Sequence, residues 1–240
     1  SPMCRSVLVE SAFAAADVPV YDSTLYEGGA SLSTADNILR VGRELGLCSD
    51  DADTNALVTR GDAAIILHVV LTQSFRIEEP PVPVTLVNAA GVNINDYLLA
   101  LRQVPEPVLA AFNAAGWTYR IDFDYMGGLS KKLNMSCIGA TNYSQKTIYL
   151  SEASATLHEF GHFLDWMLGF PAEYEQLFRA EASAAPLRNY AKTDSREYFA
   201  DCFAYWVKYA ENANAISLLQ ECAPMTYRYM EDLMRIANRL

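Results

Sequence analysis

The stretch "TLHEFGHFLDW", Thr156 to Trp166, places two of the chain's three histidines four residues apart, with a glutamate directly after the first. Residues i and i+4 of a helix project from the same side one turn apart, so His158 and His162 can reach one ion with their ring nitrogens. Glu159 lies one step round the helix, where its carboxylate can approach a water on the metal without binding the metal itself. The spacing predicts a zinc site with two histidine ligands and a glutamate general base.

The same stretch has the periodicity of an amphipathic helix. Its apolar side chains form one stripe, made of Leu157, Phe160, Leu164, Met167 and Leu168. The two histidines share another face with Asp165. Gly161, between the histidines, costs about 1 kcal/mol relative to alanine, which suggests that a neighbouring backbone or a substrate comes close there. The alternative is a chance pair of histidines on an ordinary helix.

A catalytic zinc ion needs a third protein ligand and one open position. The pattern HExxHxxGxxH is excluded, because Asp165 and Leu168 stand where its glycine and its third histidine would be. The remaining histidine, His68, lies in the apolar stretch "IILHVV", where a core or surface residue is a simpler explanation than a ligand.

A carboxylate from a second helix can complete the site. In "DSREYFADCFAYW", Glu197 and Asp201 are four residues apart, so we expect Glu197 to bind the metal and Asp201 to hold a histidine ring by its second nitrogen. The competing carboxylates, Glu173, Glu175 and Glu181, follow the motif too closely to return to it. The alternative is that Glu197 and Asp201 merely face water. Tyr190, seven residues before Glu197, can donate a hydrogen bond to the oxyanion formed when water attacks a peptide carbonyl.

Taken together, "HEFGH", Asp165, and Tyr190 seven residues before Glu197 in "EYFAD" resemble the gluzincin metallopeptidases of the anthrax lethal factor type, which include clostridial secreted proteases that cut between prolines. The resemblance covers about residues 100–210. It implies a zincin-like catalytic domain, one Zn²⁺ per chain, a peptide or protein substrate, and a secreted or cell-surface bacterial protein.

By this resemblance, His158, His162 and Glu197 bind zinc, Glu159 is the general base, and Tyr190 assists at the oxyanion. The resemblance also implies that the substrate lies against an edge strand just before the motif helix. We expect this strand at Thr147, Ile148, Tyr149 and Leu150, in "KTIYLSE". The segment between the second histidine and the tyrosine is short, so substrate specificity is not inherited from the family.

The rest of the chain predicts an α+β fold in two parts. Residues 1–77 have helical patterns, residues 78–86 form a proline-rich linker, and residues 87–240 carry a small sheet followed by helices. In "WTYRIDFDYM", alternation predicts a half-buried strand, and "CIGA" and "KTIYLSE" predict a strand pair. Gly127 and Gly128 are expected in a turn, and "SKKLN" in a solvated loop.

The order "YDS", "ELGL" and "LVTRGDAAIIL" resembles one unit of the surface-layer homology modules that attach bacterial proteins to cell walls. The resemblance covers roughly residues 20–75 and implies that the N-terminal domain attaches to a cell wall or cell surface. A helical subdomain that packs on its neighbour is an equally good interpretation.

The charge and the motifs of the chain argue against several classes of binding partner and of reaction. The 240 residues carry a net charge of −11 with a pI near 4.7, which disfavours nucleic acid and anionic lipid. No apolar run reaches the roughly 18 residues that a transmembrane helix needs. No GxSxG motif or glycine-rich phosphate loop competes with the zinc motif.

Two alternatives to a zinc endopeptidase stay open. One is a non-catalytic cell-surface or cell-wall binding module with a vestigial metal site. The other is a structural zinc ion with Cys202 as a further ligand. That cysteine lies five residues past Glu197, roughly 140° away around a helix, so we expect it to point elsewhere.

Overall fold

The computed structural model describes residues 3–49, 53–73, 75 and 77–237. The chain divides into two compact units, Ser1–Pro81 and Val82–Leu240. The division falls within the proline-rich segment 78–86, although Leu86 already belongs to a strand. Parts of the predicted N-terminal helical domain lie outside the described residues, namely 1–2, 50–52, 74 and 76.

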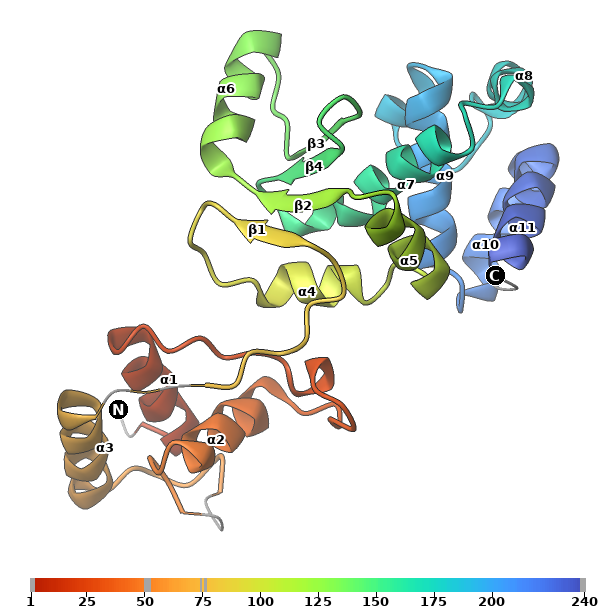
Figure 1. Ribbon diagram of the computed structural model, residues 1–240. Coiled ribbons are helices and arrows are strands. Elements are labelled where there is room, and N and C mark those ends of the chain that lie inside the picture. Colours follow the sequence, from red (N-terminus) through yellow and green to blue (C-terminus); the bar gives the residue numbers. More distant parts are fainter. Residues whose placement is uncertain (1–2, 50–52, 74, 76, 238–240) are drawn as a thin grey trace. The chain divides into compact units, whose positions relative to one another are not determined.

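The described part of the first unit is helical. It contains α1 (Arg5–Ala15), the 3-10 turn η1 (Ser23–Leu25), α2 (Thr34–Glu44) and α3 (Arg60–Thr72) (Figure 1). Ser33 caps α2 by accepting a hydrogen bond from the Asp36 amide, and Thr59 and Asp62 form a capping box at α3. One apolar core joins the three α-helices and includes Val9, Phe13, Leu39, Val41 and Ile66.

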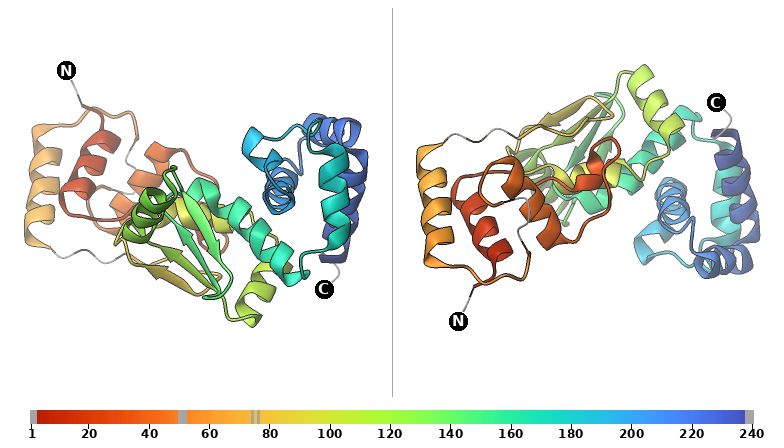
Figure 2. Two further views of the ribbon diagram at one scale, coloured as in Figure 1. Left: turned by 90° about the horizontal axis from the view of Figure 1, so that it is seen from above. Right: turned by 90° about the horizontal axis from the view of Figure 1, so that it is seen from below.

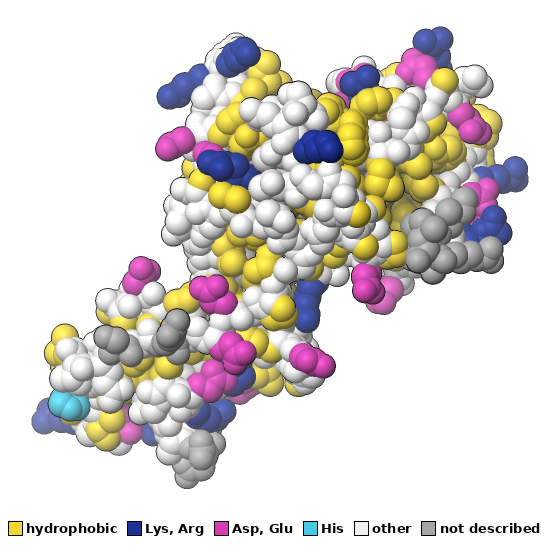
Figure 3. All heavy atoms as spheres, in the orientation of Figure 1, with side chains coloured by type: hydrophobic (Ala, Val, Ile, Leu, Met, Phe, Trp, Pro, Cys, Tyr) yellow, Lys and Arg dark blue, Asp and Glu magenta, His cyan; other side chains and the backbone are white. Residues whose placement is uncertain are grey.

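Helix α3 also carries apolar side chains on its outer surface (Figure 3). Ile65, Leu67 and Leu71 are 58, 59 and 74% exposed. His68 is exposed on the same helix, so it is a surface residue of the first unit.

The second unit is built on a four-stranded sheet. Its strands are β1 (Leu86–Asn88), β2 (Thr118–Ile121), β3 (Gly139–Asn142) and β4 (Thr147–Leu150), in the spatial order β1-β2-β4-β3. The strands β1, β2 and β4 are parallel, whereas β3 is antiparallel to β4. The predicted strand pair is present, and the predicted α+β class is confirmed. The strand predicted in "WTYRIDFDYM" ends at Ile121, because a helix begins at Phe123.

The strand expected at the edge of the sheet is an interior strand, so that prediction is wrong. Thr147, Ile148, Tyr149 and Leu150 form β4, which pairs with β2 on one side and β3 on the other, and all four residues are buried. The chain returns from β3 through a short hairpin, and this places β3 outside β4. The edge strand next to the motif helix is therefore β3.

Helices cover both faces of this sheet (Figure 1). On one face, α4 (Asn95–Leu101), α5 (Glu106–Ala114) and α7 (Thr156–Met167) enclose an aromatic core. Phe112 of α5 and Phe160 of α7 have ring centroids 4.9 Å apart, and Tyr119 of β2 stacks on Phe160. On the other face, Tyr149 of β4 stacks on Tyr125 of α6 (Phe123–Leu133).

Helix α6 corrects the prediction of a turn at Gly127 and Gly128 and of a loop at "SKKLN". Asp122 caps the helix by accepting a hydrogen bond from the Tyr125 amide, and Asn134 ends it in the left-handed conformation. Both glycines face open space. The cap and the stacked tyrosine therefore outweigh two glycine penalties of about 1 kcal/mol each.

The C-terminal part is helical, as predicted, and its helices are interrupted near Gly169, Pro186 and Pro224. A 3-10 turn, η2 (Ala153–Ala155), leads into α7, and the later elements are α8 (Ala172–Glu181), η3 (Asn189–Lys192), α9 (Ser195–Lys208), α10 (Ala213–Cys222) and α11 (Pro224–Ala237). Helix α9 packs on α7 and is flanked by α8 and α11 (Figure 2). None of the described helices is long and apolar enough to cross a membrane.

Candidate metal centre

Helices α7 and α9 pack against each other at Gly161, beside the candidate ligands, with no room for a side chain between them. A side-chain carbon built on Gly161 of α7 would come within 2.6 Å of the Ala200 Cα and 2.8 Å of the Ala200 carbonyl oxygen of α9. Both of these atoms belong to the backbone, so no rotamer change could make room. The close approach that the sequence suggested at Gly161 is therefore with α9, and it brings Glu197 to the histidines.

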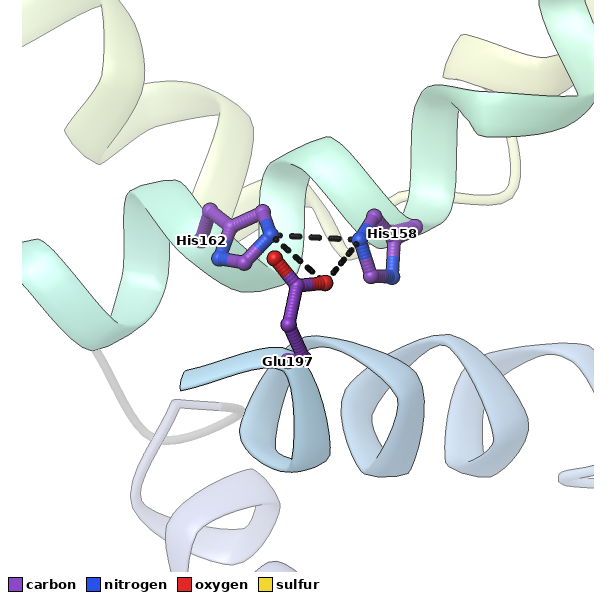
Figure 4. Close-up of side chains that lie close together, drawn as sticks. All are labelled: His158, His162 and Glu197. Atoms are coloured by element: carbon purple, nitrogen blue, oxygen red, sulfur yellow. Dashed lines mark hydrogen bonds and ion pairs between the residues drawn. The ribbon is translucent and has the colours of Figure 1, made fainter. Parts of the chain in front are cut away.

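Three donor atoms converge between these helices. His158 and His162 point from α7 toward Glu197 of α9 (Figure 4). The two Nε2 atoms are 3.1 Å apart, and Glu197 Oε2 lies 3.1 Å from the Nε2 of His158 and 3.5 Å from that of His162. Among the described residues, these three make up the group of His, Cys, Asp and Glu side chains that could hold a metal ion.

The donor set fits a zinc ion. Ligand atoms about 2.0–2.1 Å from a tetrahedral zinc ion lie about 3.3 Å from one another, which matches the three separations observed. Glu197 Oε2 is buried and, apart from the two imidazole Nε2 atoms, has no polar partner within the described residues. A cation between the three atoms would satisfy this oxygen.

The ionisation of Glu197 and that of His158 depend on each other. Burial raises the pKa of Glu197, but hydrogen bonds from His158 and His162 outweigh burial and hold that pKa well below its ordinary value. Burial lowers the pKa of His158, but hydrogen bonds to Asp201 and Glu197 raise it to about 9. Glu197 is therefore ionised in the metal-free chain, and a metal ion competes with a proton for His158.

Asp201 lies where the sequence predicts it, behind the ring of His158. Its Oδ1 atom is 2.7 Å from His158 Nδ1. The carboxylate accepts the Nδ1 proton, so Nε2, which faces Glu197 and His162, is the nitrogen that can release its proton and bind a metal ion. The side chain of Asp201 is only 9% exposed, so its geometry is set by its protein partners.

Arg188 is a partner of this aspartate that the sequence did not reveal. Its Nε donates to Asp201 Oδ2 at 2.6 Å, and one terminal nitrogen donates to Oδ1 at 2.7 Å. Arg188 lies in an irregular segment, thirteen residues before Asp201, so no helical spacing links the two. Only the path of that segment brings the guanidinium to the carboxylate.

The Glu159 carboxylate is buried beside the edge strand. One of its oxygens, Oε2, accepts a hydrogen bond from the Thr141 hydroxyl of β3 at 2.7 Å. A side-chain carbon on Gly139 would come within 2.5 Å of the other oxygen, so only glycine leaves room for the carboxylate at that position. The sequence contained no periodicity that assigns Thr141 or Gly139 to this role.

Tyr190 and the metal group line one cavity of about 970 Å³. Tyr190 lies on η3, is 43% exposed, and has its ring centroid 6.4 Å from that of His158. Burial and the charge of Glu197 raise the pKa of Tyr190 to about 12. The phenol therefore stays protonated at neutral pH and is available as a donor. Glu159 lines the same cavity.

The competing residues have other partners or positions. Glu175 pairs with Arg179 on α8, and Glu181 accepts hydrogen bonds from the amides of Met225 and Thr226 at the start of α11. Cys202 is fully buried with a free thiol, outside the cavity lining. No fourth protein ligand accompanies the two histidines and Glu197 in the part of the chain that the structure describes.

A family model and a solved structure are similar to this chain. Residues 121–233 match the family model described as anthrax toxin lethal factor, N- and C-terminal domain, which confirms the resemblance drawn from the motifs. The structure is also similar to that of the Pro-Pro endopeptidase PPEP-2 from Paenibacillus alvei, with a TM-score of 0.48 and 19% identity over 62% of this chain and 96% of that one. No curated protein matches the chain at a significant level.

Proposed function

We propose that the lethal-factor-type domain in residues 121–233 makes this chain a zinc-dependent endopeptidase. The observation that supports the proposal most strongly is the convergence of His158, His162 and Glu197, with no fourth protein ligand among the described residues. Three protein ligands and an open position distinguish catalytic zinc sites from structural ones. A zinc ion bound there would act as a Lewis acid and favour the attack of water on a peptide carbonyl.

The residues around the site have separate roles in this reaction. Glu159 accepts a proton from the attacking water and transfers it to the leaving amine, while Thr141 holds the carboxylate. Tyr190 donates a hydrogen bond to the oxyanion of the tetrahedral intermediate. Asp201 fixes the ring of His158.

The substrate is proposed to be an extended peptide. The strand β3 is the edge strand beside α7, and Ala140 and Thr141 of β3 line the cavity. A peptide can add to such an edge through main-chain hydrogen bonds, which give affinity without selecting side chains.

We also propose that the protein is secreted and that its first unit attaches it to the cell wall or cell surface, on the resemblance to surface-layer homology modules. Fractionation of the producing cells tests the location, and binding of the chain to purified cell walls tests the attachment.

The test combines metal analysis with digestion of a peptide library. The wild-type chain should contain about one zinc ion and should cleave a subset of the peptides. Glu159→Gln should keep the zinc and lose turnover, because the amide cannot accept the proton. Glu175→Gln on α8 is the control, since Glu175 lies outside the cavity lining and its partners, Ser195 and Arg179, lie outside that lining too.

The same experiment addresses the two alternatives. A non-catalytic surface-binding module would contain no stoichiometric metal and would cleave nothing. A structural zinc ion would be retained without cleavage, but the buried position of Cys202 disfavours that interpretation. Full peptidase activity in Glu159→Gln would show that the base is another residue.

A further inference from the structure

We propose that Arg188 is a positioning residue for the metal site, which it serves by holding Asp201 against His158. The inference rests on the proposed zinc function and adds a residue that no sequence motif assigns to it. Arg188 lines the cavity, but its polar contacts are with Asp201 and His158 Nδ1 and not with the three donor atoms. It acts through the carboxylate behind the first ligand.

The guanidinium contacts Asp201 as a two-pronged fork. Nε donates to Oδ2 at 2.6 Å and a terminal nitrogen donates to Oδ1 at 2.7 Å, so both carboxylate oxygens are held. This geometry fixes the plane of the carboxylate as well as its position. The side chain of Asp201 is 9% exposed and that of Arg188 is 53% exposed. The carboxylate is therefore buried, whereas the arginine side chain reaches solvent.

The fork determines where Oδ1 meets His158. Oδ1 lies 2.7 Å from His158 Nδ1, and the Arg188 terminal nitrogen lies 3.0 Å from the same Nδ1. Both nitrogens therefore direct their protons at one oxygen. If the fork were lost, Asp201 could rotate, and the ring of His158 would lose the bond that keeps Nε2 directed at the metal position.

The same arginine also joins the loop that carries Tyr190 to this assembly. Arg188 is the residue before η3, and its guanidinium carbon lies 5.4 Å from the centre of the Tyr190 ring. One side chain therefore contacts the oxyanion donor, the orienting carboxylate and the first histidine. This arrangement explains why an exposed cation lies beside a site for a divalent cation.

Simple electrostatics predicts the opposite effect of removing Arg188, which makes the inference testable. A positive charge next to a zinc site repels the ion, so its removal should tighten binding on Coulombic grounds alone. Loss of positioning should weaken binding. Changes that disturb partners of metal ligands weaken metal affinity by about 10- to 100-fold.

The experiment measures the zinc affinity of the full chain by competition with a chromophoric chelator at pH 7. Arg188→Gln should weaken zinc binding by about 10- to 100-fold. Arg188→Lys keeps the charge but loses the fork, so it should also weaken binding. Arg179→Gln is the control, because Arg179 is an exposed arginine paired with Glu175 on α8. The melting temperature of each metal-free variant separates loss of affinity from loss of folding.

Two further variants test whether Arg188 acts through Asp201. Asp201→Asn should weaken zinc binding, and adding Arg188→Gln to it should change the affinity little, because the partner of the fork is already gone. Unchanged or tighter zinc binding in Arg188→Gln would overturn the inference while leaving the zinc function intact. A wild-type chain that binds no zinc would overturn both.

Discussion

At the scale of single residues, the Glu159 carboxylate depends on one hydroxyl of the edge strand. Thr141 donates to Oε2, and Gly139 leaves space for Oε1. This arrangement holds one oxygen and leaves the other to exchange a proton with water. In the proposed reaction, the edge strand therefore positions the base in addition to offering its backbone to a peptide.

We predict that Thr141→Val lowers kcat about tenfold or more, because a hydrogen bond to a charged group contributes about 1.5–3 kcal/mol. Valine has nearly the shape of threonine but lacks the hydroxyl, whereas Thr141→Ser keeps the hydroxyl and should retain most of the activity. The measurement is steady-state cleavage of a peptide found in the library. Equal kcat values for the valine and serine variants would show that the Thr141 hydroxyl does not contribute to catalysis.

Zinc binding should release about one proton at pH 7. The hydrogen bonds to Asp201 and Glu197 outweigh burial and raise the pKa of His158 to about 9, so the ring is protonated below that pH. Glu197 has a lowered pKa and is already ionised, so it contributes no proton. Affinity should therefore rise with pH up to about 9. Calorimetry in buffers of different ionisation enthalpy measures the release, and heats independent of buffer would contradict it.

The candidate ligands could be predicted from the sequence because helical spacing fixes them. His158 and His162, and likewise Glu197 and Asp201, are i and i+4 pairs, and helix geometry alone puts each pair on one side. Arg188 could not be predicted in this way. Its contact with Asp201 depends on the path of a segment without regular structure.

At the scale of elements, the site depends on how closely α7 and α9 approach. Gly161 has no side chain, and the Ala200 backbone fills the space that a side chain would occupy. The approach sets the distance between the two histidines and Glu197. Helix–helix packing and metal geometry are therefore coupled at one residue.

Gly161→Ala should destabilise the chain by about 1–3 kcal/mol, because the added methyl group overpacks a contact made of backbone atoms. It should also weaken zinc binding, since α9 must move away with Glu197. Gly128→Ala on α6 is the matched control: its methyl group would face open space and should be neutral or stabilising by up to about 1 kcal/mol. Chemical denaturation measures both changes. A Gly161→Ala variant as stable as the control would show that the helices are not in tight contact.

Sequence patterns predict some helices and strands of this chain correctly and miss others. The motif helix with its apolar stripe is present as predicted, as α7. Helix α6 is not predicted, because Gly127 and Gly128 favour a turn over a helix, although Asp122 caps the helix. The interior position of β4 could not be predicted, because strand order depends on how the chain turns between β3 and β4. The alternation of residues within one strand does not indicate which strands pair with it.

At the scale of the whole molecule, the candidate chemistry belongs to one unit. All three donor atoms, Glu159 and Tyr190 lie in Val82–Leu240. The first unit has its own core and an exposed apolar surface on α3. The composition of segment 78–86 predicts a division at this place, because prolines there prevent a continuous helix.

The account depends most on a single zinc ion between α7 and α9. A crystal of the zinc-loaded chain, measured on both sides of the zinc absorption edge, tests this directly. The account predicts one anomalous peak per chain, about 2.0–2.1 Å from the Nε2 atoms of His158 and His162 and about 2.0–2.2 Å from a Glu197 oxygen, with no fourth protein ligand. A peak elsewhere, a fourth protein ligand, or no peak at this position would contradict it.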